Sequence, residues 1–123
     1  MHNGEVTPEE HVAGHPLALE VLDAVRSVLA PYGDVQVRTT TSQIAFRRRR
    51  GFAYVWLPGR YLARPAADVV LSVVLGRRDE SPRWKEVAHP SPAHWMHHLE
   101  VADVADLDDE VAGWLREAAD RAA

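Results

Sequence analysis

The segment VQVRTTTSQIAFRRRRGFAYVWLPG, residues 35–59, decides the fold of this chain. Within it, large aliphatic or aromatic side chains occur at every second residue, and this period of two is that of a β-strand. The alternating stretches are VQVR (35–38), IAFR (44–47) and FAYVWL (52–57). A glycine at position 51 is able to supply the positive φ that a tight hairpin turn requires, so the arginines at 47–50 are expected near a hairpin tip.

Two further strands are expected beyond this segment. Residues 69–75, VVLSVVL, are apolar at both alternating positions, which predicts a central strand that is covered on both faces and ends at Gly76. Residues 94–101, HWMHHLEV, alternate as a strand does, although Ser91 and Pro92 before them also suit the start of a helix. We predict a strand for this stretch.

Helical patterns lie on either side of the strand region. Residues 7–10, TPEE, form a capping box and predict a short helical turn that ends at Gly14. Residues 16–30 carry apolar side chains at helical spacing, and the sequence PYG at 31–33 ends that helix. Residues 106–118 begin with several carboxylates, which complement a helix dipole, and continue with an apolar stripe.

These elements predict one α+β domain over residues 1–123, with a flexible leading segment at 1–7. Its antiparallel sheet has about five strands, and the N- and C-terminal helices pack on one face. The sequence has no cysteine, which excludes disulfides and thiolate metal sites. The acidic residues 1–10 do not form a signal peptide, and the apolar run at 69–75 is shorter than a membrane helix of ~20 residues. We expect a cytoplasmic protein with no membrane partner.

Charge is divided between the middle of the chain and its ends. Residues 38–85 hold eleven basic side chains and three acidic ones, a balance of +8. The remaining residues hold three basic and fifteen acidic side chains, a balance of −12, which gives the net charge of −4. The pattern predicts a basic surface framed by acidic elements, and basic surfaces commonly bind anions. The net negative charge counts against tight binding of a nucleic-acid duplex.

Three stretches, SPRWKEV (81–87), HHLEV (97–101) and DLDDEVAGWLREA (106–118), together resemble a known family. Their order is similar to that of the bacterial family called domain of unknown function 5655. Its members show a Ser-Pro-Arg-aromatic stretch, a paired-histidine strand and an acidic final helix containing Trp-Leu. The resemblance runs from about Thr7 onward and implies the fold, but no assigned activity. Some relatives look like accessory domains joined to zinc ribbons or nuclease-related regions, whereas this chain lacks the cysteines of a ribbon.

The first candidate site is a basic and aromatic face of the sheet. Arg47 and Arg49 share a face in a strand, and guanidinium groups match the oxygens of a phosphate. Tyr54 and Trp56 share a parity with Phe52. If the helices cover the other face of the sheet, these rings lie beside the arginines, where they would stack on planar ligands. Two alternatives stay open. The rings form the core or a homodimer interface, or the arginines form a solvated tip or partner the acidic helices.

Histidines at positions 89, 94, 97 and 98 form the second candidate site. On a helix, His94 and His98 would lie one turn apart and share a zinc ion. On a strand they stand about 13 Å apart, and His97 points to the opposite face. We therefore expect no metal and no cofactor, and a hydrogen bond from His97 or His98 to a ligand near neutral pH. An alternative pocket lies between Trp84, Trp95 and the histidines.

The sequence offers little for nucleophilic catalysis. Its serines lie outside any G-x-S-x-G elbow, and no glycine-rich phosphate loop follows a strand. We therefore expect a non-enzymatic binding module for an anionic or planar partner, either single-stranded nucleic acid or a phosphorylated or aromatic metabolite. The alternatives are a small enzyme, a metabolite-binding protein with a Trp/His pocket, and a homodimer that buries the basic face. The expected ligand-binding residues are Arg47, Arg49, Tyr54, Trp56, Trp84, His97 and His98.

Overall fold

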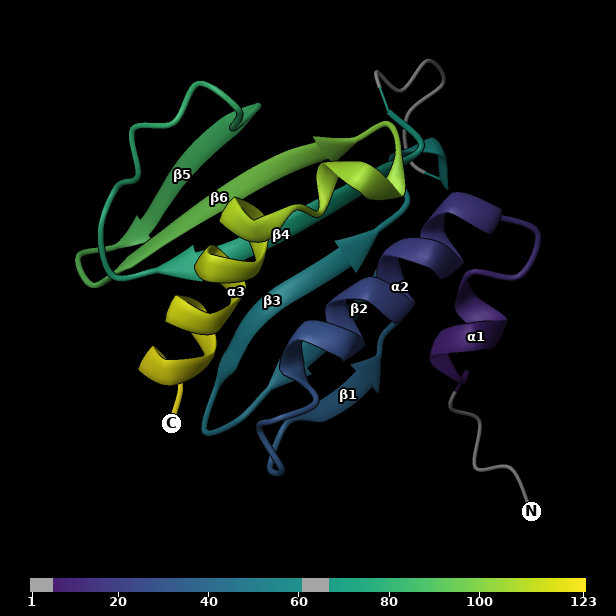
Figure 1. Ribbon diagram of the computed structural model, residues 1–123, viewed down its shortest axis with the longest axis horizontal. Coiled ribbons are helices and arrows are strands. Elements are labelled where there is room, and N and C mark those ends of the chain that lie inside the picture. Colours follow the sequence, from purple (N-terminus) through teal and green to yellow (C-terminus); the bar gives the residue numbers. More distant parts are fainter. Residues whose placement is uncertain (1–5, 61–66) are drawn as a thin grey trace.

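The computed structural model describes residues 6–60 and 67–123, with strands in the middle of the chain and helices toward both ends (Figure 1). The helical elements are α1 (Pro8–His11), α2 (Pro16–Leu29), α3 (Asp109–Arg121) and the short 3-10 turns η1 (Pro58–Arg60) and η2 (Val104–Asp106). The strands are β1 (Gln36–Thr39), β2 (Gln43–Arg47), β3 (Gly51–Trp56), β4 (Val69–Leu75), β5 (Glu86–Ser91) and β6 (His94–Val101). The strand predicted at 94–101 is therefore confirmed. Positions 1–5 of the leading segment lie outside the described residues.

The strands form an antiparallel sheet in the order β1-β2-β3-β4-β6-β5. This confirms the predicted α+β class, with six strands in the sheet instead of about five. The additional strand is β5, whose sequence EVAHPS contains Pro90 and is poor in strand-forming patterns. An edge strand tolerates proline because one of its sides needs no N–H donor.

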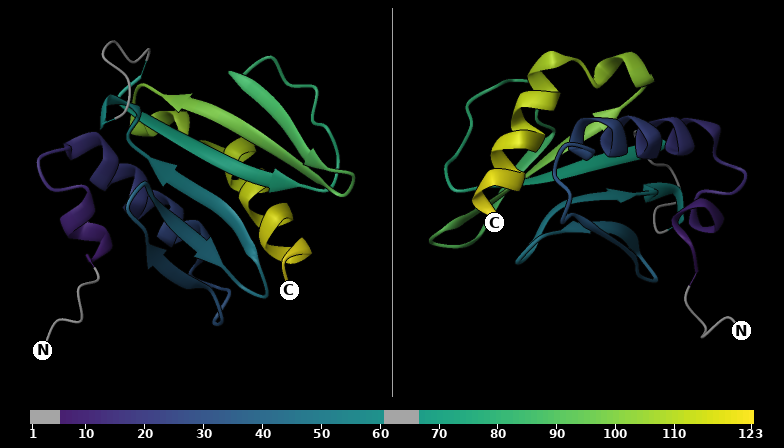
Figure 2. Two further views of the ribbon diagram at one scale, coloured as in Figure 1. Left: turned by 180° about the vertical axis from the view of Figure 1, so that it is seen from behind. Right: turned by 60° about the horizontal axis from the view of Figure 1, so that its bottom comes forward.

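Helices α2 and α3 lie on one face of the sheet, as predicted (Figure 1). The rear view in Figure 2 shows the opposite side with no helix in front of it. We call this side the open face; it carries Tyr54, Trp56, Ser72 and His98 near its centre. All residues of β4 are buried, although helices cover only one of its faces. The core on the helix side includes Val21, Leu22 and Val25 of α2, Leu71 and Val73 of β4 and Leu115 of α3.

Capping bonds fix where the helices begin. At α1, the Thr7 hydroxyl accepts from the Glu10 N–H at 3.1 Å, and the Glu10 carboxylate accepts from the Thr7 N–H at 3.2 Å, as the capping box predicted. Gly14 follows with φ 81°, a conformation that favours glycine. Among the described glycines it alone has a positive φ, so the positive φ expected at Gly51 does not occur. At α3, the Asp108 carboxylate accepts from the Val111 N–H at 3.1 Å. None of the described helices is long and apolar enough to cross a membrane.

A register shift between β2 and β3 changes the face on which one ring lies. Phe46 pairs with Ala53, but the next residue, Arg47, pairs with Gly51, which leaves Phe52 between the two pairs. A bulge adds one residue to a strand and breaks the alternation of faces at that point. Phe52 and Ala53 both lie in the helix-facing core, and Phe52 is only 1% exposed. The expectation that Phe52 shares a face with the two later rings of β3 is therefore wrong.

Candidate binding site on the open face

A row of paired residues crosses the open face at Tyr54. This residue pairs with Ala45 of β2 on one side and with Ser72 of β4 on the other, and Ser72 pairs with His98 of β6. Ala45 and Ser72 are small and nearly buried, at 5% and 3% exposed. Tyr54 is therefore the aromatic side chain that this row presents on the open face, where a half-buried ring is able to stack on a planar group.

Trp56 lies on the same face, two residues farther along β3. It pairs with Gln43 of β2 and Val70 of β4, and it is half-buried, as is Tyr54. The helices cover the Ala53 and Val55 side of β3, so Tyr54 and Trp56 lie outside the helix-facing core. This is one of the two placements that the sequence left open for these rings.

Two of the four arginines at 47–50 bind the C-terminal end of α3. Arg48 donates to the carbonyl oxygen of Ala119 at 2.8 Å, and Arg50 donates to that of Arg121 at 3.0 Å. The last carbonyls of a helix lack intrahelical partners and form the negative end of its dipole, so guanidinium groups are stabilising there. The alternative that these arginines partner the helices is thus correct for Arg48 and Arg50.

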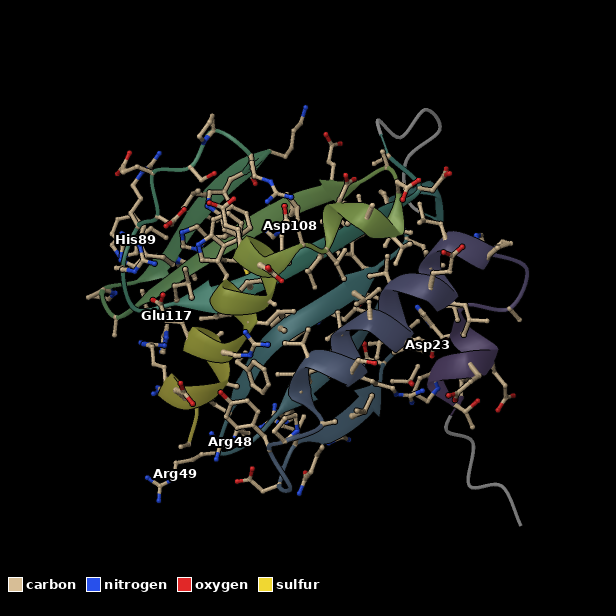
Figure 3. The ribbon with its side chains drawn as sticks, in the orientation of Figure 1. Asp23, Arg48, Arg49, His89, Asp108 and Glu117 are labelled. Carbon is tan, nitrogen blue, oxygen red and sulfur yellow. The ribbon has the colours of Figure 1, made fainter. Side chains whose placement is uncertain are left out.

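The other two arginines point in different directions. Arg47 is the last residue of β2 and, by the alternation of that strand, lies exposed on the open face. Arg49 lies in the hairpin turn, where its backbone N–H donates to the carbonyl oxygen of Ala122 at 2.8 Å. Figure 3 shows its side chain extending into solvent beyond α3. The structure therefore places Arg47, but not Arg49, on the face that carries Tyr54.

Acidic side chains neutralise much of the excess basic charge in residues 38–85. Arg77 binds Glu117 of α3 at 2.8 Å, and Arg83 binds Asp108 at 3.0 Å at the start of the same helix. Within the described residues, the basic side chains of this segment that have no ion pair are Arg38, Arg47, Arg49, Arg50 and Lys85. Four of them belong to β1, β2 and the β2–β3 turn, so the remaining basic surface is confined to that end of the sheet.

A hollow of about 330 Å³ lies on the open face beside Tyr54. Its lining consists of Arg50, Gly51, Tyr54, Val74, Pro90, Ser91, His94 and Met96. The bulge explains its origin. By the register of β3 and β4, the residue opposite Val74 is Phe52, whose side chain lies in the core. Gly51 adds no side chain, and a Cβ there would overlap the Tyr54 hydroxyl group. Strand β3 therefore places no side chain of its own opposite Val74, and the Tyr54 hydroxyl lies over the Gly51 backbone.

The family model for DUF5655, a domain of unknown function, matches residues 9–121, from α1 to the end of α3. The chain belongs to this family. The match confirms the resemblance seen in the sequence. Neither the curated proteins nor the solved structures gave a match. Because the family description assigns no activity, the function of this DUF5655 domain has to be argued from its geometry.

Two of the predicted ligand contacts, Trp84 and His97, lie in the core of the DUF5655 domain, on the helix side of the sheet. The Trp84 ring packs against His97, with centroids 4.9 Å apart, and against Trp114 of α3 at 4.2 Å. His97 donates from Nδ1 to the carbonyl oxygen of Trp95 at 3.0 Å, and its Nε2 accepts from the Asp79 N–H at 2.9 Å. The sheet therefore separates Trp84 and His97 from the rings of the open face.

Acid is expected to destabilise this DUF5655 domain through His97. Burial lowers the pKa of His97 below its ordinary value of 6.5, so the unfolded chain binds the proton more readily than the folded one. The stabilisation is complete above about pH 6.5 and decreases as pH falls, with a slope of up to about 1.4 kcal/mol per pH unit for one proton. Urea denaturation between neutral pH and pH 5 measures this slope. His97→Gln, which keeps one donor and one acceptor, should reduce this slope and leave the part that His98, whose pKa burial also lowers, contributes in the same direction. The exposed His89→Gln should not change it; equal slopes in all three proteins would contradict the assignment.

The other histidines of the DUF5655 domain do not gather at one point. His94 and His98 lie on the open face, as the strand geometry predicted. Trp95 stacks on His89 with ring centroids 3.4 Å apart, and this pair is separate from the stack that contains Trp84. In the part of the chain that the structure describes, no three His, Cys, Asp or Glu side chains are arranged to hold a metal ion.

One contact on the open face resembles part of a catalytic triad. Ser72 Oγ lies 2.7 Å from His98 Nδ1, and His98 pairs with Glu86 of β5. Acyl transfer needs a hydroxyl that substrate can reach and N–H donors for the oxyanion. Ser72 is nearly buried, and it lies inside β4, which is paired on both sides with β3 and β6. Burial also lowers the pKa of His98, which favours its neutral ring. The geometry therefore supports a buried polar contact better than a nucleophile.

Of the residues that line the hollow, only Tyr54 is among the expected ligand-binding residues, although the sequence also pointed to Arg50 within the arginine run and to His94 within the histidine group. The others come from the β2–β3 turn, β4 and the β5–β6 hairpin, which the sequence does not bring together. One signal was available, because a glycine within a strand pattern indicates a bulge or a close approach of another group. At Gly51 of this DUF5655 domain both occur: the register shifts beside it and the Tyr54 hydroxyl lies over it.

Proposed function

We propose that this DUF5655 domain is a non-enzymatic binding module that holds a planar, anionic partner on the open face of its sheet. The observation that carries the proposal is the position of Tyr54 on the helix-free face, between the small residues Ala45 and Ser72. Arg47 lies on the same face and has no ion pair among the described residues. A ring that stacks and a guanidinium that binds phosphate together match a base joined to a phosphate.

The charges on the open face favour a ligand with few phosphates. Arg38 and Arg47 lie on β1 and β2, whereas Glu86 and Glu100 lie on the same face of β5 and β6. Nonspecific affinity for nucleic acid increases with the number of phosphates that are neutralised, and the net charge of −4 opposes it. A short single strand or a free nucleotide is therefore a better match than a duplex.

His98 contributes a neutral contact at most. Its Nδ1 already faces the Ser72 hydroxyl, so one ring nitrogen is left for a ligand. Burial lowers the pKa of His98, which means that the ring is uncharged near neutral pH and does not attract a phosphate electrostatically. Arg47 and Tyr54 therefore carry the proposal more strongly than either histidine of the expected site.

The test titrates the protein at low salt with short oligothymidylate and with thymidine monophosphate, using calorimetry. Both probes are expected to bind the wild-type protein. Tyr54→Ala should make the binding free energy of each probe less favourable by about 1–3 kcal/mol, the contribution of one stacked base. The matched control is His89→Ala, which removes an exposed ring that stacks on Trp95 and should keep wild-type affinity.

Three outcomes would refute the proposal. The first is the absence of saturable binding of either probe by the wild-type protein. The second is an equal loss of affinity in Tyr54→Ala and His89→Ala, which would move the site away from the open face. The third is a dimer, detected by light scattering, that dissociates in Tyr54→Ala, because this would show that the open face is buried against a second copy.

A further inference from the structure

The hollow beside Tyr54 adjoins positive charge that no described acidic side chain balances. Arg50 lines it and donates to the carbonyl oxygen of Arg121. Arg121 in turn donates to the carbonyl oxygen of Ala93 and lies 3.2 Å from His94 Nδ1. Neither arginine has an ion pair in the described part of the chain. Burial and the charge of Arg50 lower the pKa of Arg121, which reflects two guanidinium groups near each other without a counterion.

Side chains around the hollow offer hydrogen-bond donors from several directions. A guanidinium group has no acceptor, so His94 Nδ1 accepts from Arg121 and the neutral ring carries its proton on Nε2. Arg50 has further N–H groups besides the one that binds α3. The hydroxyls of Tyr54 and Ser91 have no hydrogen-bond partner within the described residues. Donors of four kinds thus come from the β2–β3 turn, β3 and the β5–β6 hairpin.

The floor of the hollow is apolar. Val74 of β4 and Met96 of β6 pair with each other across the sheet, and Pro90 adds a third apolar surface at the edge. Ligand pockets typically combine such a floor with a few polar groups, in volumes of about 300–1,000 Å³. At about 330 Å³, the hollow is at the lower end of that range. It therefore suits one small molecule with an apolar part and a group that accepts hydrogen bonds.

We propose that this hollow binds the phosphate group of a small phosphate monoester, whose organic part lies over Val74 and Met96. The inference goes beyond the proposed function, because it places a phosphate at Arg50 in the hollow, whereas Arg47 and the Tyr54 ring carry the proposal above. A phosphate monoester presents three peripheral oxygens in a tetrahedral arrangement, whereas the two oxygens of a carboxylate lie in one plane. Donors from Arg50, Tyr54 and the β5–β6 hairpin approach from different sides and match the tetrahedral group better.

The test uses phenyl phosphate as the probe and the backbone amide resonance of Gly51 as the readout, in isotope-labelled protein at low salt. A saturable shift is expected for the wild-type protein. Arg50→Gln should weaken binding at least about tenfold, because it removes a charge-assisted hydrogen bond to the phosphate. Glutamine is two bonds shorter than arginine and does not reach the Arg121 carbonyl, so this variant also loses the Nη2 contact with α3.

The matched control is Arg49→Gln, the same change of charge one residue away. The Arg49 side chain extends into solvent, so this variant should stay within about twofold of the wild-type affinity. A second variant, Ser91→Ala, removes only a hydroxyl at the rim and leaves both arginines in place. Ser91→Ala should also lower the affinity for phenyl phosphate. It keeps the test valid if Arg50→Gln does not fold.

Specific results would overturn the inference. Equal affinities of Arg50→Gln and Arg49→Gln would show that the hollow does not bind the phosphate. Benzoate that binds as tightly as phenyl phosphate, with the same shift at Gly51, would refute the preference for a tetrahedral anion. Nucleotides that bind through Tyr54 equally well in Arg50→Gln would leave the binding module intact and refute the hollow. Phenyl phosphate bound at Gly51 without any nucleotide binding would instead support the hollow and refute the nucleotide-like partner.

Discussion

Replacing Trp84 by alanine is expected to lower the free energy of unfolding by about 3–5 kcal/mol, the usual cost of removing a large buried ring. The Trp84 side chain is 9% exposed and packs between His97 of β6 and Trp114 of α3. Its Nε1 donates to the Asp79 carboxylate at 2.9 Å, which fixes the loop after β4. Trp84→Ala therefore removes contacts with β6, with α3 and with the loop after β4. Urea denaturation followed by circular dichroism measures the loss.

The neighbouring Lys85 provides the control. Lys85 is exposed and forms no ion pair among the described residues, so Lys85→Ala should change the free energy of unfolding by no more than about 0.5 kcal/mol. A loss below about 1 kcal/mol in Trp84→Ala would contradict the buried placement. It would then restore Trp84 as a residue that a ligand is able to reach, as the sequence predicted.

A second large loss of stability is expected for Phe52→Ala, again about 3–5 kcal/mol. Phe52 is 1% exposed and lies in the helix-facing core because of the register shift beside Arg47. Tyr54→Ala is the matched variant, two residues along the same strand. Its ring lies on the open face, so it should cost about 1 kcal/mol. Chemical denaturation of both variants gives the comparison.

The comparison of Phe52 with Tyr54 tests the bulge directly. In a strand without a bulge, residues two apart share a face, so replacing either by alanine would lower the free energy of unfolding by a similar amount. Equal losses in Phe52→Ala and Tyr54→Ala would therefore contradict the register shift. They would also remove the explanation of the hollow, which depends on the absence of the Phe52 side chain from the open face.

Local patterns were sufficient to predict most of the fold. The capping box at Thr7, the alternation of β6 and the carboxylates before α3 depend on neighbours within one element, and each prediction is confirmed. Strand β5 was not predicted, because an edge strand with Pro90 satisfies fewer of the requirements on which strand patterns depend. Its existence depends on its pairing with β6, which the sequence of β5 alone does not indicate.

The candidate site was harder to predict, because it depends on register and on distant ion pairs. In FAYVWL both alternating sets are apolar, so the sequence did not decide which set faces the helices. The structure places Tyr54 and Trp56 on the open face, as one alternative stated, but moves Phe52 away from them. The charge pattern overstated the basic surface, because partners such as Arg77 and Glu117 lie far apart in sequence.

Helix α3 supplies Trp114 and Leu115 to the core and its last carbonyls to Arg48 and Arg50. On the ribosome, α2 and the first four strands emerge before this helix, since synthesis proceeds from the N-terminus at about 5–20 residues per second. For a time on the order of seconds, the nascent sheet therefore lacks one of the two helices that cover its apolar side. During that interval the exposed apolar surface is prone to self-association, and the speed of synthesis from residue 76 to the end of α3 sets how long the exposure lasts.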